Sequence, residues 1–278
     1  MQSNSKPTAP HAKSTSGRLT AKQRQAQTRQ QQQWFVLVTV GIAVLVLVVI
    51  AFALLRNPAP NGSDAQTRYA GIPSGVTTSG PLANISYPAP MPYLGSPEAL
   101  VKIEEIGSFS CPVCLDYHDS KFNAYFDEIQ AGHLQFIYLP TTLTGDFNAV
   151  PGTQAAYCAI QQQPGKFWPL YDLLFDAQQR YGADAARRDH LDALAKQINL
   201  DSGPFDTCLD SSPSTSFVRT ADDYANQRGL RGTPTIFLYA KGQQITSTQI
   251  GPNQTPGDMS SLSSAQIKTL IDNTIKGS

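Results

Sequence analysis

The chain has 278 residues, of which 41% are hydrophobic and 15% charged, with 21 basic and 21 acidic side chains. This composition fits one globular domain with additional segments, and it excludes collagen, coiled-coil rods and fully disordered chains. Residues 1–33 hold six basic side chains and no acidic one, so the rest of the chain has a net charge of −6, which argues against a nucleic-acid-binding surface.

The first long apolar stretch covers residues 34–55, which are 22 residues without a charge. As a helix it would be about 33 Å long, enough to cross a bilayer and longer than the apolar part of a cleavable signal peptide. We predict a retained transmembrane helix here. Because six basic residues precede it, the positive-inside rule places the N-terminus in the cytoplasm and everything after residue 55 outside.

Two segments flank this stretch. Residues 1–33 are rich in polar and basic side chains and too poor in apolar ones to form a core, so we predict a disordered cytoplasmic tail. Residues 56–97 contain eight Pro and five Gly, a density typical of low-complexity linkers. We therefore predict a linker over residues 56–97 and a folded domain over residues 98–278.

The predicted domain begins with patterns typical of an α/β fold. Residues 99–106 alternate as in a strand, with Glu105 on the same face as two aliphatic side chains. A helix is expected after Cys111, and residues 133–139 read as a second strand. Strand, helix and strand in this order predict a parallel βαβ unit.

Helical periodicity follows over about residues 145–229. After Pro234 the pattern returns to strands, with a hairpin turn expected at Lys241 and Gly242. The last helix is expected to start at a capping box, in which Ser263 is followed three residues later by a Gln. The predicted order is βαβ, a helical insertion, and ββα.

The chemically distinctive motif is Cys111-Pro112-Val113-Cys114. Cysteines three apart at a helix start can form a small disulfide ring, because such residues face each other on a helix. The helix N-terminus favours a thiolate at Cys111, and Pro112 suits the first turn because it has no N–H to leave unpaired. We interpret Cys111 as the exposed nucleophile and Cys114 as the more buried resolving thiol.

Two other uses of this pair stay open at this point. A zinc site is one, because His118 follows on the same face, although structural zinc usually takes four ligands and the remaining cysteines stand singly. An inert structural disulfide between Cys111 and Cys114 is the other, since exported cysteines commonly pair for stability.

Four segments give the chain a resemblance to a known family. In chain order they are EIGSFSCPVC, GKFWPLYDLLF, FDTCLDS and GLRGTPTIFL. Together they resemble the DsbA-like thioredoxin-fold thiol:disulfide oxidoreductases, particularly the membrane-anchored Gram-positive and actinobacterial type, over roughly residues 93–278. The resemblance implies a thioredoxin fold with a helical insertion, the same order that the periodicity predicts.

The resemblance also implies roles for the surroundings of the motif. Thr233 and Pro234 match the family's cis-proline dipeptide, which faces the active disulfide and binds extended substrates. With Pro112 and Val113 they are the expected substrate-binding residues.

Three further residues have counterparts in the family. Glu105 matches its buried acid beneath the disulfide, which can shuttle the proton of Cys114, and burial should raise the pKa of such a carboxyl. Cys158 and Cys208 match the structural disulfide of the actinobacterial type, with two unbridged thiols as the alternative.

Two positions depart from the family pattern. Ser108 stands where many relatives have Asp, and Val113 stands where the best-known strong oxidants have His. Valine can neither donate a hydrogen bond nor carry positive charge near the thiolate. This departure favours a less acidic Cys111 and a less oxidising disulfide.

The leading functional hypothesis is a membrane-anchored, extracytoplasmic oxidoreductase that introduces disulfides into reduced exported polypeptides through Cys111 and Cys114. This chemistry needs no cofactor and no metal, but the family implies a quinone-linked membrane oxidase that restores the disulfide. An exported reductase or isomerase would run the same chemistry in reverse. A non-enzymatic metal-binding domain is the third hypothesis.

Overall fold

The structure is a computed structural model that describes residues 37–46, 62–143, 149–245 and 260–277. The chain divides into two units, residues 1–58 and 59–278. In the first unit, residues 37–46 are helical. Within the described ranges, no helix combines the length and the apolar character that a membrane crossing requires. Most of the predicted span at 34–55, and all of the predicted tail at 1–33, lie outside these ranges.

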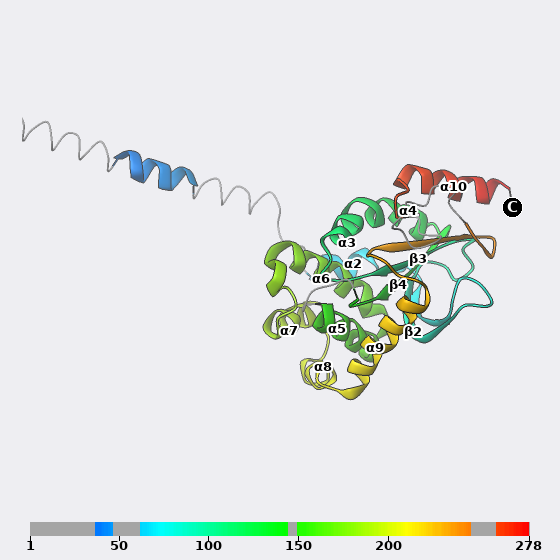
Figure 1. Ribbon diagram of the computed structural model, residues 1–278. Helices are drawn as coiled ribbons and strands as arrows, with labels where there is room; N and C mark the ends of the chain where they lie inside the picture. The colour runs from blue at the N-terminus through cyan, green and yellow to red at the C-terminus, as the bar shows by residue number, and fades with distance from the viewer. Residues whose placement is uncertain (1–36, 47–61, 144–148, 246–259, 278) are drawn as a thin grey trace, which may run out of the picture. The chain divides into compact units, whose positions relative to one another are not determined.

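The second unit is built on a six-stranded mixed sheet (Figure 1). The strands in spatial order are β1 (Ser74–Ser79), β2 (Ser86–Leu94), β4 (Leu134–Pro140), β3 (Val101–Gly107), β5 (Thr235–Ala240) and β6 (Gln243–Gln244). Strands β3 and β4 are parallel, and every other neighbouring pair is antiparallel. Strand β3 is therefore central and is paired along both edges.

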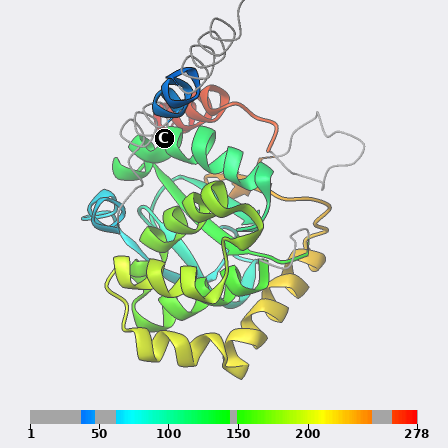
Figure 2. The ribbon, with the colours of Figure 1, turned by 90° about the vertical axis from the view of Figure 1, so that its left-hand side faces the viewer.

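Helices and helical turns connect and cover these strands. They are α2 (Gly62–Arg68), α3 (Pro112–Tyr117), the π-helical turn η1 (His118–Phe122), α4 (Asn123–Gln130), α5 (Ala149–Gln162), η2 (Pro164–Lys166), α6 (Phe167–Tyr181), η3 (Gly182–Asp184), α7 (Arg188–Gln197), α8 (Ser202–Leu209), α9 (Ser212–Gln227) and α10 (Ser264–Lys276). Helices α5 to α9 form the predicted insertion between β4 and β5, and they fill the lower half of the view in Figure 2. The predicted order of βαβ, helices and ββα is present.

The predicted linker over residues 56–97 is wrong over much of its length. Its second half forms β1 and β2, and α2 precedes them. The three prolines of β2 stand at alternate positions, so they remove N–H donors from one edge of the strand only. Strand β2 pairs with β1 along most of its length but with β4 only through Tyr93 and Leu94. The high proline content therefore belongs to a strand that is largely unpaired along one edge, and not to a linker.

The two faces of the sheet carry separate apolar cores. One core contains Ile103, Phe136 and Tyr138 and is covered by α3, α4, α6 and α10. The other contains Ile106 and Tyr239 and is covered mainly by α9. Figure 1 shows α4 and α10 on one side of the strands and α9 on the other. Because both faces are covered, every residue of β3 except the half-buried Lys102 is buried, whichever face it points to.

Two local predictions about the C-terminal third are confirmed. Lys241 and Gly242 both have positive φ and form the tight turn between β5 and β6. Ser263 caps α10, and the side chain of Gln266 reaches back to complete the capping box. These elements complete the sheet edge and the cover over α4.

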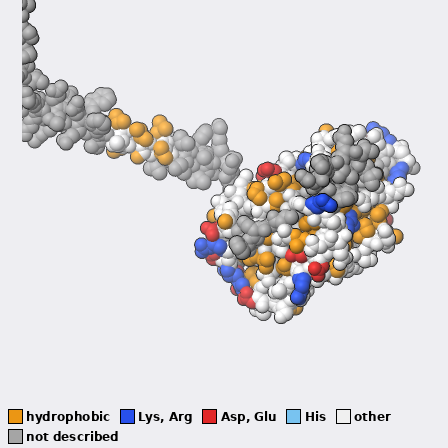
Figure 3. Space-filling view, viewed as in Figure 1, with side chains coloured by type: hydrophobic (Ala, Val, Ile, Leu, Met, Phe, Trp, Pro, Cys, Tyr) orange, Lys and Arg blue, Asp and Glu red, His pale blue; other side chains and the backbone are white. Residues whose placement is uncertain are grey.

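The surface of the second unit carries no single-sign field on the face shown in Figure 3, where acidic and basic side chains are mixed. Over α7 and α8, for example, Arg188 forms ion pairs with Asp206 and Asp210.

Candidate active site

The cysteine motif lies where β3 ends and the active-site helix begins. Cys111 is the N-cap of α3, with extended backbone angles, and Pro112 occupies the first helical turn. The carbonyl of Cys111 accepts hydrogen bonds from the N–H groups of Cys114 and Leu115 at 3.1 Å each. The backbone N–H groups at this end of the helix point toward Sγ of Cys111.

The two thiols are free and have opposite acidities. A hydrogen bond from the Cys114 thiol, supported by backbone N–H groups of the first turn, outweighs burial and lowers the pKa of Cys111 to about 5. Burial raises the pKa of Cys114 well above its ordinary value. The neighbouring thiol and the backbone supply donors that Val113 lacks. That Cys111 is less acidic than in relatives with His at this position stays a prediction.

The exposure of the motif differs from the prediction in one respect. The predicted exposed nucleophile, Cys111, is only 8% exposed, and Cys114 is fully buried. The residues between them form the accessible surface, since Val113 is 59% exposed and Pro112 is exposed as well. A partner thiol would therefore reach the Cys111 sulfur past these two side chains.

The loop before β5 approaches the same sulfur. The Thr233–Pro234 peptide bond is cis, and the carbonyl oxygen of Thr233 lies 3.4 Å from Sγ of Cys111. Pro234 is buried and Thr233 half-buried. The structure thus brings together two segments 122 residues apart in the sequence.

Glu105 lies beneath the motif on β3 and is fully buried. Within the described residues, neither of its carboxylate oxygens has a hydrogen-bond partner. Burial raises the pKa of Glu105 to about 8, and the positive charge of His118 opposes that rise. The hydroxyl of Tyr138, directly across on β4, is also buried without a partner among these residues. A carboxyl group in such surroundings exchanges its proton near neutral pH.

Glu104, which the sequence analysis did not single out, is equally buried on the opposite face of β3. Its oxygens accept hydrogen bonds from the hydroxyls of Tyr224 (3.0 Å) and Tyr239 (2.8 Å), and Arg228 lies 3.5 Å away. These partners are 120 residues or more distant in sequence. The sequence offers one signal for this site, a glutamate in a strand expected to be buried. No nearby residue identifies the groups that pair with Glu104.

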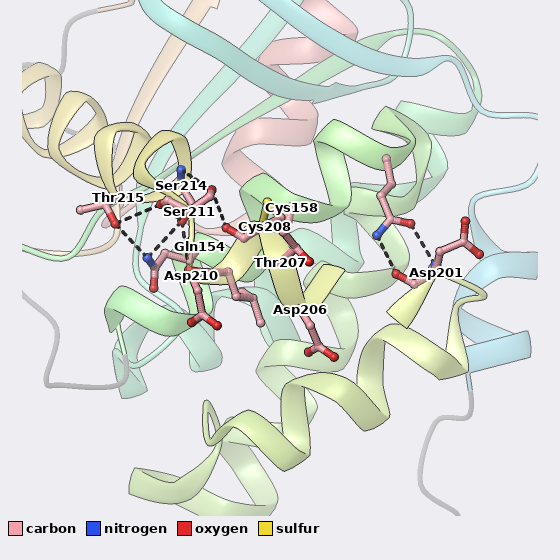
Figure 4. The surroundings of a disulfide bond; sticks show 12 residues. Gln154, Cys158, Asp201, Asp206, Thr207, Cys208, Asp210, Ser211, Ser214 and Thr215 are labelled. Atoms are coloured by element: carbon pink, nitrogen blue, oxygen red, sulfur yellow. Dashed lines mark hydrogen bonds between the residues drawn. A yellow bond between two sulfur atoms is a disulfide. The ribbon is translucent and has the colours of Figure 1, made fainter. Parts of the chain in front are cut away.

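Cys158 of α5 and Cys208 of α8 form a disulfide within the insertion (Figure 4). Cys158 is fully buried, whereas Cys208 is half-buried. Close by, Ser211 caps α9, and the amide of Gln154 donates a hydrogen bond to the hydroxyl of Ser214 at 3.2 Å. The bond and these contacts join three helices of the insertion.

His118 does not turn toward the cysteines, as a shared zinc site would require. Its two ring nitrogens lie 2.8 Å from a carboxylate oxygen of Asp119 and 2.9 Å from one of Asp172. In the described part of the chain, no group of three or more His, Cys, Asp or Glu residues is arranged to hold a metal ion.

Comparisons with known proteins agree with this geometry. A model of the thioredoxin family matches residues 89–262. The chain is 24% identical over 148 residues to a probable disulfide bond formation protein D of Bacillus anthracis (52% of this chain, 68% of that protein). It is 25% identical over 156 residues to disulfide bond formation protein D of Bacillus subtilis (54% and 68%).

Two solved structures share the fold. The chain is similar to oxidised BdbD from Bacillus subtilis, with a TM-score of 0.55, 21% identity and coverage of 67% of this chain and 93% of that one. It is also similar to alpha-DsbA1 from Wolbachia pipientis, with a TM-score of 0.55, 18% identity and coverage of 69% and 94%. The chain belongs to the thioredoxin family and is a DsbA-like thiol:disulfide oxidoreductase.

Proposed function

We propose that the protein introduces disulfides into reduced exported polypeptides through Cys111 and Cys114. The acidity of Cys111 carries this proposal. A pKa of about 5 means that the reduced pair is held as a thiolate at neutral pH. Stabilising the reduced form makes the corresponding disulfide more oxidising, so electrons flow from the substrate to the enzyme.

The reaction proceeds in two exchanges. A substrate thiolate attacks Sγ of Cys111 in the oxidised pair, forming a mixed disulfide and breaking the bond to Cys114. A second substrate thiolate attacks the substrate sulfur of that mixed disulfide and releases Cys111 as a thiolate. The substrate gains a disulfide and loses two electrons, which the two active cysteines now hold.

Glu105 is the proposed proton donor to the sulfur of Cys114 when the active disulfide breaks. A thiolate is unstable where Cys114 lies, since burial raises the pKa of that thiol. With a pKa of about 8, Glu105 is protonated at neutral pH and can donate its proton to the sulfur as the bond breaks. In the reverse direction the carboxylate takes the proton back.

Substrate contacts are assigned to the surface around the Cys111 sulfur. Pro112 and Val113 offer an exposed apolar edge, and Thr233 and Pro234 lie on the other side of the sulfur. An extended polypeptide bound between them would present its cysteine to Cys111.

The cellular setting rests on the sequence. Residues 34–55 are proposed as a single retained membrane helix with the catalytic domain outside the cell. A quinone-linked membrane oxidase is the proposed electron acceptor for the reduced pair. The Cys158–Cys208 disulfide is proposed as structural rather than catalytic.

Two measurements test the proposal. The full chain with Cys111→Ser should lose oxidation of a reduced, unfolded test protein, and retained activity would reject the assignment. The reduction potential against glutathione should lie well above the roughly −270 mV of thioredoxin. A value near thioredoxin's would instead favour an exported reductase.

A further inference from the structure

His118 stands seven residues after the catalytic Cys111, in the π-helical turn between α3 and α4. Such turns interrupt regular helices frequently at functional sites. The His118 side chain is almost completely buried, and its ring stacks on Phe122 and Phe175 with centroids 5.7 and 4.9 Å away. A polar ring removed from water in this way needs partners for both of its nitrogens.

Both partners are carboxylates. Nδ1 lies 2.8 Å from Oδ1 of Asp119, and Nε2 lies 2.9 Å from Oδ1 of Asp172. Asp172 also accepts hydrogen bonds from the hydroxyl of Tyr69 (2.7 Å) and from the guanidinium of Arg68 (2.9 Å). Asp172 already accepts from a guanidinium and a hydroxyl, so it acts as an acceptor and the imidazole donates to it. Because an ionised carboxylate only accepts, both ring nitrogens donate and the ring carries a positive charge.

We infer that His118 is a fixed imidazolium cation of the redox site, a positioning residue that holds the active-site helix on α6 and α2 and acts electrostatically on Glu105. The inference rests on the proposed role of Glu105 as the proton donor and acceptor for Cys114. His118 itself touches neither sulfur nor substrate.

The groups that face His118 come from four elements. They are Asp119 on η1, Tyr171, Asp172 and Asp176 on α6, Arg68 at the end of α2 with Tyr69 directly after it, and Glu105 on β3. Asp119 and Asp172 both contact the ring, whereas Arg68 contacts Asp172, so the nearest groups favour the charged ring. Burial lowers the pKa of His118, but the hydrogen bonds to Asp119 and Asp172 outweigh it and the net pKa is raised. The same charge opposes the rise in the pKa of Glu105.

Histidine NMR of the full chain tests the charge directly. The ring carbons of uniformly labelled histidine are followed between about pH 5 and pH 9, and the His118 signal is identified by its loss in His118→Gln. We expect His118 to remain an imidazolium at pH values where an ordinary histidine, with a pKa of about 6.5, is neutral. Titration of His118 at or below that value would overturn the inference.

The effect on Glu105 has its own readout. In the oxidised full chain, the infrared band of the protonated Glu105 carboxyl is identified by its loss in Glu105→Gln and titrated with pH. Removing a nearby positive charge should raise its midpoint by roughly one pH unit in His118→Gln. An unchanged midpoint would mean that His118 only packs against the helix, and would overturn the electrostatic role.

His133→Gln is the matched control. His133 contacts Glu128 through one ring nitrogen at 2.9 Å, and its side chain is 46% exposed. We expect this substitution to leave the Glu105 band unmoved, and an equal shift in both variants would contradict a specific effect of His118.

A double-variant cycle links the charge to turnover. If His118 acts through Glu105, His118→Gln should shift the pH dependence of single-turnover oxidation in the wild-type background and have no such effect in Glu105→Gln. A shift that persists without Glu105 would contradict the inference. Neither spectroscopic readout needs catalysis, so loss of the proposed oxidase function would leave the test of His118 intact.

Discussion

Glu104 and Glu105 are adjacent in the central strand, and both are fully buried, yet they point to opposite faces and meet opposite surroundings. On the α9 face, Glu104 accepts two tyrosine hydrogen bonds and lies against the guanidinium of Arg228. On the cysteine face, Glu105 has no hydrogen-bond partner among the described residues. The same side chain is thus structural on one face and poised for proton transfer on the other.

The comparison shows that burial alone does not identify a functional carboxyl. Burial raises the pKa of both groups, but Glu104 has an arginine and two hydroxyls that stabilise its charge. Arg228 ends α9 just before the loop that carries Thr233, and Tyr239 belongs to the strand that follows this loop. The Glu104 cluster therefore ties the end of α9 to β5, the two elements that the loop next to Cys111 connects, while Glu105 remains available to the sulfur of Cys114.

The largest expected effect is on stability. Glu104→Ala leaves the half-buried Arg228 and the hydroxyls of two buried tyrosines without their carboxylate, so we expect the free energy of unfolding to fall by about 3–5 kcal/mol. Glu105→Leu removes an unpaired carboxyl, so at neutral pH we expect a change within about 1 kcal/mol or a gain. Urea unfolding of both variants measures this. Equal losses would remove the distinction between the two faces.

Two tyrosines on neighbouring strands sharpen the contrast. Tyr239→Phe deletes a donor to Glu104 and an acceptor for Arg228, which should cost about 1.5–3 kcal/mol. Tyr138→Phe removes a hydroxyl that has no partner among the described residues and should cost less than about 0.5 kcal/mol. The same unfolding assay compares them, and a larger loss for Tyr138 would show that its hydroxyl is engaged.

Gly107 tests how tightly the unpaired carboxyl is enclosed. A Cβ at this position would lie 2.8 Å from Oε1 of Glu105 and 2.9 Å from the hydroxyl of Tyr138. Gly107→Ala should therefore displace Glu105, cost about 1–3 kcal/mol and slow single-turnover oxidation. Gly203→Ala, which meets nothing within 4 Å, is the control and should leave the oxidation rate unchanged. An unaffected rate in Gly107→Ala would show that the position of Glu105 is not critical.

The fourth prediction is a pH slope. The native pKa of Glu105 is about 8, above the value of about 4.3 expected in the unfolded chain, so the native state holds the extra proton between these values. The free energy of unfolding should fall with rising pH in this window, by up to about 1.4 kcal/mol per pH unit from this group. Glu105→Gln should remove that contribution, and Glu104→Gln a smaller one. A wild-type slope retained in Glu105→Gln would contradict the raised pKa.

Local patterns in the sequence predicted much of the fold and part of the site. Alternation placed Glu105 on a core-facing side of its strand, and the capping box and hairpin turn lie where their short motifs predict them. These features depend on residues a few positions apart. The acidity of Cys111 depends on backbone groups and a neighbouring thiol, which the residue type at Val113 does not reveal.

The remaining features depend on distant partners. Glu104 meets Tyr239 across 135 residues, and His118 meets Asp172 across 54, so no local pattern indicates either contact. The strands of residues 74–94 were missed for a different reason. Proline frequency suggested disorder, whereas the alternate spacing of the prolines is compatible with a strand that leaves one edge unpaired.

The position of Cys158 bears on how an enzyme that exchanges disulfides protects its own. An incoming thiolate that attacked the half-buried sulfur of Cys208 would displace Cys158 as a thiolate, and this sulfur lies on the buried face of α5. Such a leaving group is poor, because a thiolate in apolar surroundings is strongly disfavoured. The Cys158–Cys208 bond is thereby protected from the exchange reactions at Cys111. Mild reductant should make Cys111 alkylatable in the folded chain, while Cys158 and Cys208 stay bonded until the helices unfold.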